Sequence, residues 1–179
     1  MKWLAALALG TILHPAIAVR DIDGVTREPL KVEKGQVGAL FFVTNDCPVS
    51  NYYAHEIRRI CDEYAKRGAG CSLIYTDATL TDDQAKKHAQ DYGHGAYPKM
   101  VDRTHALVKA TGATITPTAV LIRPDGSIAY RGRIDNSFAA IGVQRRVVTE
   151  HDLRDALDAV FAGRPVAKPE EPAVGCYIP

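Results

Sequence analysis

The stretch VGALFFVTNDCPVSN, residues 37–51, decides the fold. Its first seven residues form an almost continuous apolar run, which is typical of a central strand buried on both faces of a parallel sheet. A polar loop occupies residues 44–51, and the apolar residues between 52 and 66 then recur at helical spacing. A buried strand that leads through a short loop into an amphipathic helix is typical of an α/β protein.

The rest of the chain alternates between further predicted strands and helices. We expect strands at residues 71–75, 97–102, 118–122 and 127–131, and helices at residues 79–92 and 106–111. A last helix is predicted to start at Thr149, with Asp152 completing a shortened capping box, and to end at Gly163. The turn at residues 123–126 joins two of the strands in an antiparallel hairpin. The fold class that follows is α/β, with a central mixed β-sheet flanked by helices.

The first 18 residues have the pattern of a secretory signal peptide. Lys2 supplies a positive charge, residues 3–13 are largely apolar, and Ala16-Ile17-Ala18 fits a small-x-small cleavage site. The apolar run is too short to span a bilayer, which needs roughly 20 residues. An uncleaved anchor or a buried N-terminal helix is the alternative. We expect cleavage after Ala18, export to a periplasm or out of the cell, and no membrane span in the mature chain.

After the signal peptide we expect one domain, residues 19–163, and a tail, residues 164–179. A single domain is the ordinary expectation for a chain of 179 residues. The tail contains four prolines and carries Cys176, and we predict that it is extended and mobile rather than packed. With 22 Lys and Arg against 21 Asp and Glu, the net charge of +1 argues against nucleic acid or an anionic membrane as the partner.

Export places the four cysteines, Cys47, Cys61, Cys71 and Cys176, in an oxidising compartment, where four thiols allow three pairings. Cys61 falls on the inward face of the first helix, and Cys71 begins the following strand. A disulfide between these two would contribute about 2.7 kcal/mol, and two buried free thiols are the alternative. The chain has no CxxC and no paired Cys/His spacing of the kind that binds zinc. We therefore expect neither a metal nor another cofactor.

Cys47 lies where the central strand leads into the helix, and Pro48 follows it. Proline suits the first helical position because the N–H that it lacks would be unpaired there, so Cys47 is at or next to the N-cap. Unsatisfied backbone N–H groups and the helix dipole favour an anion at that place and lower a thiol pKa. Thr44, three residues earlier, is placed to donate its hydroxyl to the sulfur or to a bound oxyanion. Ser50 occupies the position of the second cysteine in a CxxC motif.

A second motif, Thr116-Pro117, precedes a predicted buried strand. A trans proline there would remove a ladder hydrogen bond, so a cis peptide bond is one interpretation, and a trans proline in a loop is the other.

These motifs and the order of the elements resemble the thioredoxin fold and, within it, the redoxin branch of AhpC/TSA, peroxiredoxin-like proteins. The resemblance covers residues 20–163 and rests on Thr44-x-x-Cys47-Pro48 and on ITPT at residues 115–118. It implies that Cys47 is the redox-active cysteine, that Thr44 lies beside it, and that Pro117 is a cis-proline facing it across the active site. We expect Pro48, Ser50 and Thr116 to contact the substrate.

The chain departs from the family's patterns at three places. The peroxiredoxin pattern P-x-x-x-T-x-x-C has Leu40 at its first position here. The arginine of that active site is not placed by a motif, and the candidates are Arg123, Arg131 and Arg133. Ser50 replaces the resolving cysteine of the thioredoxin signature.

A site with one cysteine needs another thiol to resolve its mixed disulfide or sulfenic acid. Cys176 is a candidate, because the 12 residues that separate it from Arg164 reach about 40 Å when extended. The alternative is that Cys176 pairs with another chain or with small thiols.

The histidines carry less information. His55, His88 and His151 are predicted to lie on the surface, because each falls on a polar helix face or in a first turn. His94 and His105 flank a loop that could approach the site.

The sequence therefore predicts an exported thiol–disulfide oxidoreductase in which Cys47 is the nucleophile. The substrate is a protein disulfide, or a peroxide if the protein is a thiol peroxidase, and Cys176 or an external thiol reductant regenerates the site. The alternative from another class is a non-catalytic binding module that uses the Pro117 groove for a peptide or metal partner.

Overall fold

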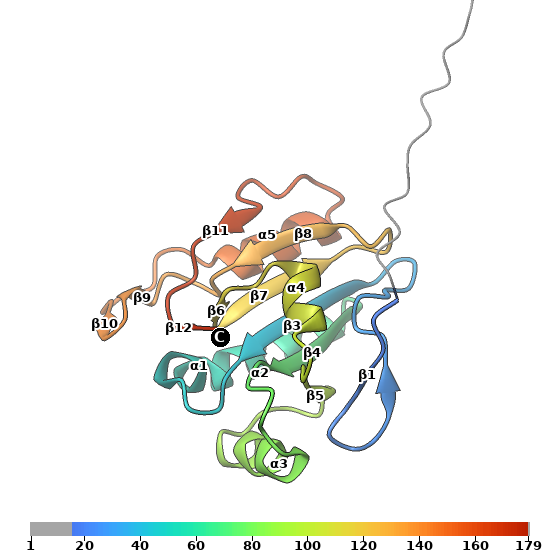
Figure 1. The fold of residues 1–179 in the computed structure, drawn as a ribbon. Coiled ribbons are helices and arrows are strands. Elements are labelled where there is room, and N and C mark those ends of the chain that lie inside the picture. The colour runs from blue at the N-terminus through green and yellow to red at the C-terminus, as the bar shows by residue number, and fades with distance from the viewer. Residues whose placement is uncertain (1–15, 179) are drawn as a thin grey trace, which may run out of the picture.

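Strand β3 (Val37–Val43) lies at the centre of the structure, a computed structural model that describes residues 16–178. All seven of its residues are buried, because the strand is covered on both faces (Figure 1). It pairs in parallel with β4 (Ala69–Tyr75) and antiparallel with β7 (Thr118–Ile122). The signal peptide predicted for residues 1–18 lies almost wholly outside the described residues.

The main sheet has six strands in the order β11-β8-β7-β3-β4-β5. β5 (Lys99–Val101) pairs in parallel with β4, and β8 (Ile128–Gly132) pairs antiparallel with β7. β11 (Glu170–Glu171) adds in parallel at the outer edge of β8. The parallel core with an antiparallel neighbour confirms the mixed sheet predicted from the sequence.

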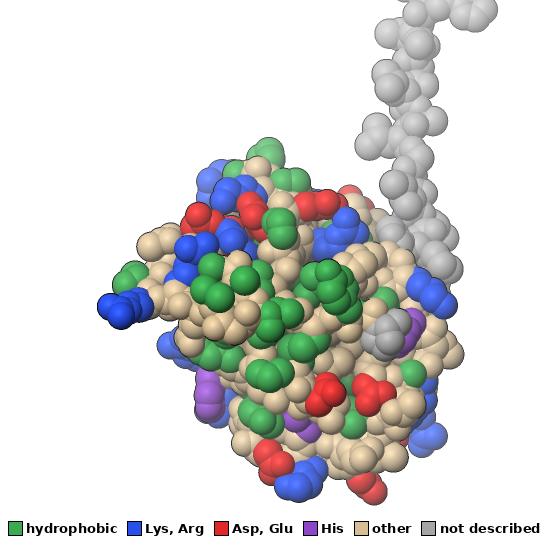
Figure 2. Space-filling model, turned by 60° about the vertical axis from the view of Figure 1, so that its left-hand side comes forward, with side chains coloured by type: hydrophobic (Ala, Val, Ile, Leu, Met, Phe, Trp, Pro, Cys, Tyr) green, Lys and Arg blue, Asp and Glu red, His purple; other side chains and the backbone are tan. Residues whose placement is uncertain are grey.

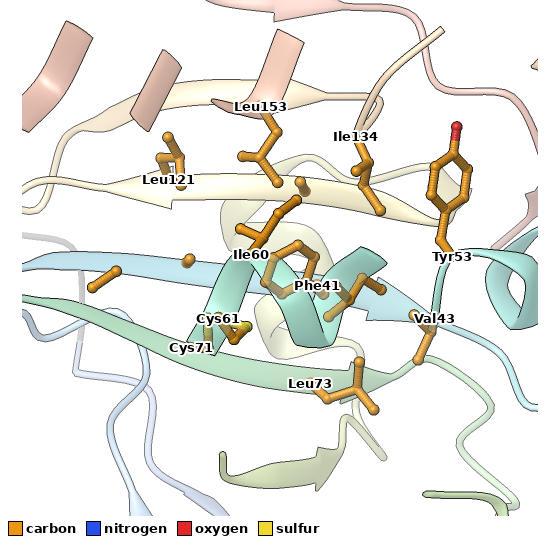
Figure 3. Packing of buried hydrophobic residues seen from close by; sticks show 14 of the residues in the cluster. Phe41, Val43, Tyr53, Ile60, Cys61, Cys71, Leu73, Leu121, Ile134 and Leu153 are labelled. Carbon is orange, nitrogen blue, oxygen red and sulfur yellow. A yellow bond between two sulfur atoms is a disulfide. The ribbon is translucent and has the colours of Figure 1, made fainter. Parts of the chain in front are cut away.

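Helices cover both faces of this sheet, which confirms the α/β fold class. α2 (Ala54–Ala65) and α5 (Asp152–Phe161) pack on one face, against side chains that include Phe41 and Leu121 (Figure 3). α4 (Ala106–Thr111) packs on the opposite face, within a second apolar cluster. Burial of apolar surface on both faces therefore fixes the central strand and the loop that follows it.

Three of the predicted helices, at residues 52–66, 79–92 and 149–163, differ in extent from the helices in the structure. A separate short helix, α1 (Pro48–Tyr52), precedes α2, and Tyr53 lies between the two. α3 (Asp82–Asp91) begins later than predicted, because Thr81 caps it through a capping box with Gln84.

The capping box predicted at Thr149 and Asp152 is wrong, because α5 has His151 as its N-cap. Thr149 is bonded elsewhere: its Oγ1 accepts from Asn136 Nδ2 at 2.8 Å, and its N–H donates to Asn136 Oδ1 at 3.0 Å.

Three antiparallel strand pairs lie outside the main sheet. They are β1 (Val19–Arg20) with β2 (Thr26–Arg27), β9 (Phe138–Ala140) with β10 (Val143–Gln144), and β6 (Ile115–Thr116) with β12 (Cys176–Tyr177). Among residues 16–178, no helix has both the length and the apolar character needed to cross a membrane.

The prediction that the tail is unpacked is wrong. The tail is extended, but β11 pairs with β8 and β12 pairs with β6. Two glycines permit these close approaches, since a Cβ at Gly132 would overlap the Glu171 carbonyl oxygen and one at Gly175 would overlap that of Thr116. The pairing depends on strand edges that exist only in the folded protein, so the composition of the tail does not reveal it.

Ion pairs hold the same tail against α5. Lys168 Nζ lies 3.5 Å from Glu150, 3.8 Å from Asp152 and 3.4 Å from Glu171. Arg133 Nε lies 2.7 Å from Asp152 Oδ2, and the Asp152 side chain is only 3% exposed. A buried carboxylate is costly without a cationic partner, so Arg133 and Lys168 together stabilise this end of the tail.

Cys61 and Cys71 are joined in a disulfide, with their Cα atoms 5.9 Å apart. The bond ties α2 to β4 inside the core (Figure 3). Cys47 and Cys176 are the two thiols that remain.

Candidate active site

Cys47 is the N-cap of α1 and follows directly on the loop after the central strand. Its backbone is extended, with φ −80° and ψ 114°, and Pro48 takes the first helical position. The carbonyl of Cys47 accepts a hydrogen bond from the Asn51 N–H at 3.0 Å, which starts the helix. The side chain is fully buried, with 0% of its surface exposed. The sulfur therefore lies inside the protein at a strand-to-helix junction.

The loop before β7 lies against this cysteine. The Thr116–Pro117 peptide bond is cis, and the Cys47 thiol donates to the Thr116 carbonyl oxygen at 3.4 Å. Thr44 Oγ1 lies 3.1 Å from Thr116 Oγ1. Thr44 thus links the two loops of the site through Thr116 instead of donating to the sulfur, which is one of the two roles predicted from the sequence. The other role, donation to a bound oxyanion, stays a prediction.

The C-terminal tail brings Cys176 to the same place. In the register of β12 with β6, Cys176 is opposite Thr116, and the Ile178 N–H donates to the Thr114 carbonyl at 2.9 Å. Cys176 Sγ donates to Cys47 Sγ at a distance of 2.7 Å. The structure therefore brings together two cysteines that are 129 positions apart in the sequence.

The two thiols are electrostatically unequal. Burial raises the pKa of Cys47, but the hydrogen bond from the Cys176 thiol and the polar N–H and hydroxyl groups of Ser50 near the sulfur outweigh it, so the pKa lies below its ordinary value of 9.0. Burial and the neighbouring Cys47 raise the pKa of Cys176 to about 11. Because a thiolate is the reactive form of cysteine, these shifts make Cys47 the more readily ionised thiol of the pair, with Cys176 as its hydrogen-bond donor.

Ser50, which occupies the position of the second cysteine in a CxxC motif, contributes to this difference in pKa between the two thiols. The residue is 1% exposed, and within residues 16–178 its Oγ has no hydrogen-bond partner of ordinary geometry. The hydroxyl is close enough to the Cys47 sulfur to lower the pKa of that thiol. Ser50 therefore favours the thiolate form of Cys47.

The three candidate arginines are engaged away from Cys47. Arg123 contacts Ser127 in the β7–β8 turn, Arg131 pairs with Glu170, and Arg133 pairs with Asp152. None of them is among the groups that shift the pKa of Cys47. The polar groups that stabilise the Cys47 thiolate are therefore a hydroxyl, a thiol and backbone groups, and not the guanidinium group of any of these three arginines.

His88 is buried, which the sequence prediction of a surface histidine missed. Its Nδ1 lies 2.9 Å from the Tyr75 hydroxyl and its Nε2 lies 2.9 Å from Asn51 Oδ1. Asn51 Nδ2 in turn donates to the Asn45 carbonyl in the loop that carries Cys47. His88 and Asn51 therefore position that loop, and no short motif in the sequence signals the connection.

The other histidines within residues 16–178 do not join the site. His55 and His151 are exposed, as predicted. His94 bonds to the Tyr97 hydroxyl at 2.9 Å, and His105 Nε2 lies 2.8 Å from the Thr76 carbonyl oxygen. Across residues 16–178, no three His, Cys, Asp or Glu side chains are grouped so that they could hold a metal ion.

A six-stranded mixed sheet, a cysteine at the start of the first core helix and a cis-proline opposite it define a thioredoxin-like redoxin. The chain belongs to the AhpC/TSA family, whose sequence model matches residues 14–131. No curated protein matches the chain.

Solved structures share this fold. The chain is similar to an uncharacterized conserved protein from Geobacillus kaustophilus, with 28% identity, a TM-score of 0.77, and coverage of 92% of this chain and 88% of that one. It is also similar to a hypothetical protein from Sinorhizobium meliloti 1021, with 25% identity, a TM-score of 0.75, and coverage of 90% and 89%.

A more distant likeness is to a secreted Mycobacterium tuberculosis disulfide oxidoreductase homologous to E. coli DsbE. It has 16% identity, a TM-score of 0.53, and coverage of 63% of this chain and 80% of that one. At this identity the likeness concerns the fold alone.

Replacing Ser50 with alanine should raise the pKa of Cys47, because the variant loses a hydroxyl that stabilises the thiolate. We expect the first thiol titration, followed by the ultraviolet absorbance of the thiolate, to move to higher pH. Ser127→Ala is the matched control, since Ser127 bonds to Asp125 in a surface turn. An unchanged titration in Ser50→Ala would show that the hydroxyl does not act on the sulfur.

Replacing Gly175 with alanine should separate the two thiols without altering either of them. The added Cβ would overlap the Thr116 carbonyl oxygen, so β12 must move away from β6. We expect oxidation by diamide to form the Cys47–Cys176 bond at least about tenfold more slowly, which corresponds to roughly 1.4 kcal/mol. Gly70→Ala is the control, because a Cβ there meets no atom within 4 Å. Equal oxidation rates in the two variants would contradict the role of the close approach.

Proposed function

We propose that this protein is an exported thiol–disulfide oxidoreductase whose redox centre is the pair formed by Cys47 and Cys176. The observation that carries the proposal is the distance of 2.7 Å between the two sulfur atoms. A disulfide bond is about 2.05 Å long, so only a small movement separates the dithiol from the disulfide.

The reductive half of the cycle begins at Cys47. Its thiolate attacks one sulfur of a substrate disulfide, that bond breaks, and the other substrate sulfur leaves as a thiolate that takes up a proton. Cys176 then loses its proton and attacks Cys47 Sγ in the mixed disulfide, which releases the second substrate thiol. The substrate disulfide has gained two electrons and two protons, and Cys47 and Cys176 have become a disulfide.

An external dithiol restores the pair. Cys176 is half-buried whereas Cys47 is fully buried, so the incoming thiolate reaches Cys176 first. Cys47 is also the better leaving group, because its pKa is lowered whereas that of Cys176 is raised to about 11. The inequality between the two thiols thus favours attack at Cys176 and departure of Cys47.

Substrate access involves the tail. β12 lies along β6 and covers Cys47, so a protein substrate reaches Cys47 after β12 separates from β6. The groove that opens is bounded by Thr116 and Pro117 on one side and by Pro48 and Ser50 on the other. These residues are the ones proposed to contact substrate.

Thiol peroxidase activity is the second candidate. The same sulfur contact favours it, because Cys176 could condense with a Cys47 sulfenic acid and release water without a large rearrangement. The positions of Arg123, Arg131 and Arg133 weigh against it, since each is engaged away from the sulfur. We therefore place disulfide exchange first.

Export is supported by the pattern of residues 1–18 and by the cysteine chemistry. A Cys61–Cys71 disulfide is suited to an oxidising compartment, and so is a redox pair that cycles through a disulfide. The mature chain is proposed to begin at Val19.

The test measures reduction of a fluorogenic disulfide peptide and, separately, consumption of hydrogen peroxide. Cys47→Ser should lose at least about 100-fold in the peptide assay, because the nucleophile is gone. Cys176→Ser should accumulate a mixed disulfide between Cys47 and the peptide, visible by mass. The double variant Cys61→Ala/Cys71→Ala is the matched cysteine control and should keep the activity.

Two outcomes would overturn the order of the candidates or the proposal itself. Peroxide consumption without peptide reduction would make the protein a peroxidase. Equal inactivity of the wild type and Cys47→Ser in both assays would make it a non-catalytic binding module.

A further inference from the structure

Exposed apolar side chains gather around the cysteine pair. Of the seven large hydrophobic residues that are exposed within residues 16–178, five lie on α1, on β12, or in and just after the β9–β10 hairpin. These five are Tyr52, Ile141, Val143, Val147 and Tyr177. Figure 2 shows hydrophobic side chains spread across this side of the molecule, with basic groups at its left edge and acidic groups above and below them. Clusters of this kind mark interaction sites more often than scattered apolar residues do.

The two ends of this cluster are tied to the cysteines. Tyr177 follows Cys176 directly and is 81% exposed. Tyr52 is the last residue of α1, the helix that Cys47 caps, and its ring lies 4.9 Å from the ring of Phe138 at the start of β9. The hairpin is thereby packed beside the active-site helix (Figure 1).

The hairpin is firmly anchored although its outer part is exposed. Asp135 accepts a hydrogen bond from the Tyr53 hydroxyl at 2.5 Å, and the Asn136 side chain bonds to the backbone N–H groups of Thr149 and Glu150. Both residues at the base are buried. Because the base is fixed, a partner that binds the hairpin loses little conformational entropy in ordering it.

The positive charge of the β9–β10 hairpin indicates which kind of partner it binds. Residues 138–149 contain no Asp or Glu, and Arg145 and Arg146 are exposed and make no ion pair within the described residues. In a two-fold dimer of this chain, the same face of the two copies would be in contact. Arg145 and Arg146 of one copy would then face those of the other copy, and their like charges would repel. The complementary partner is therefore a different protein, apolar at the centre of its contact surface and acidic at the rim.

We propose that the face formed by Tyr52, residues 138–147 and Tyr177 docks a dithiol redox protein that reduces the Cys47–Cys176 disulfide. The inference rests on the proposed function. The partner's first thiolate attacks Cys176 Sγ, the Cys47–Cys176 bond breaks, and Cys47 leaves as a thiolate that takes up a proton. The partner's second thiolate then attacks its own half of the mixed disulfide and releases Cys176. The partner ends as a disulfide and this protein as a dithiol.

The test uses the full chain, oxidised to the Cys47–Cys176 disulfide, and a reduced thioredoxin probe in two forms. One form carries added glutamates beside its active-site cysteines, and the other carries added lysines. We expect the glutamate form to react faster, and Arg145→Glu/Arg146→Glu to slow it by at least about tenfold while accelerating the lysine form. Ile141→Ser/Val143→Ser should slow both forms. Dithiothreitol is too small to need the face and should reduce every variant at one rate.

The matched control reverses two charges at the far end of the sheet. Lys34 precedes β3, and Lys66 is the C-cap of α2, two residues before Gly68, whose carbonyl accepts a hydrogen bond from the first residue of β3. Both lysines are exposed. Lys34→Glu/Lys66→Glu changes the net charge as much as the arginine variant does, and it should leave the rates with both probe forms unchanged.

Three results would overturn the proposal. Equal rates for wild type and Arg145→Glu/Arg146→Glu with both probe forms would show that the face does not contact the partner. Loss of binding to phosphatidylglycerol vesicles as the sole effect of the variants would assign the face to a membrane. Failure of the wild type to form a Cys47–Cys176 disulfide that dithiothreitol reduces would refute the proposed function, and the docking face with it.

Discussion

The backbone pairing of β12 with β6 is the interaction on which the site depends. It sets Cys176 opposite Thr116, and the Thr116 carbonyl in turn accepts a hydrogen bond from Cys47. Backbone groups at a strand edge are strong donors and acceptors whose pairing fixes register, so a two-residue strand is enough to position a side chain. Gly175 makes the approach sterically possible. Without this pairing, Cys47 would be a lone buried thiol with a serine in the place of its partner.

The contact between the sulfur atoms of Cys47 and Cys176 makes the two thiols chemically different from one another. Cys47 lies at a helix start among donors from Ser50 and Cys176, which stabilise its thiolate despite burial. Cys176 lies beside that sulfur, which raises its own pKa. In the proposed cycle this inequality gives Cys47 the role of nucleophile and leaving group and Cys176 the role of resolving thiol. The order in which the two sulfurs react in that cycle follows from this inequality.

Local sequence patterns predicted the parts of the fold that local physics controls. The apolar run of β3 required burial on both faces, and Pro48 marked the helix start that makes Cys47 an N-cap. The packed tail and the buried His88 were not predicted, because each depends on partners distant in the sequence: β6 and β8 for the tail, Tyr75 and Asn51 for His88. Prolines in the tail indicated extension correctly, but extension is compatible both with free chain and with a paired strand.

The most direct measurement of the central claim is disulfide mapping by mass spectrometry across a series of glutathione redox buffers. The account predicts one peptide pair, containing Cys47 and Cys176, that passes from dithiol to disulfide as a single two-electron transition, while Cys61–Cys71 stays intact throughout. A protein in which Cys47 becomes glutathionylated or links two chains, with Cys176 remaining a thiol, would contradict the account.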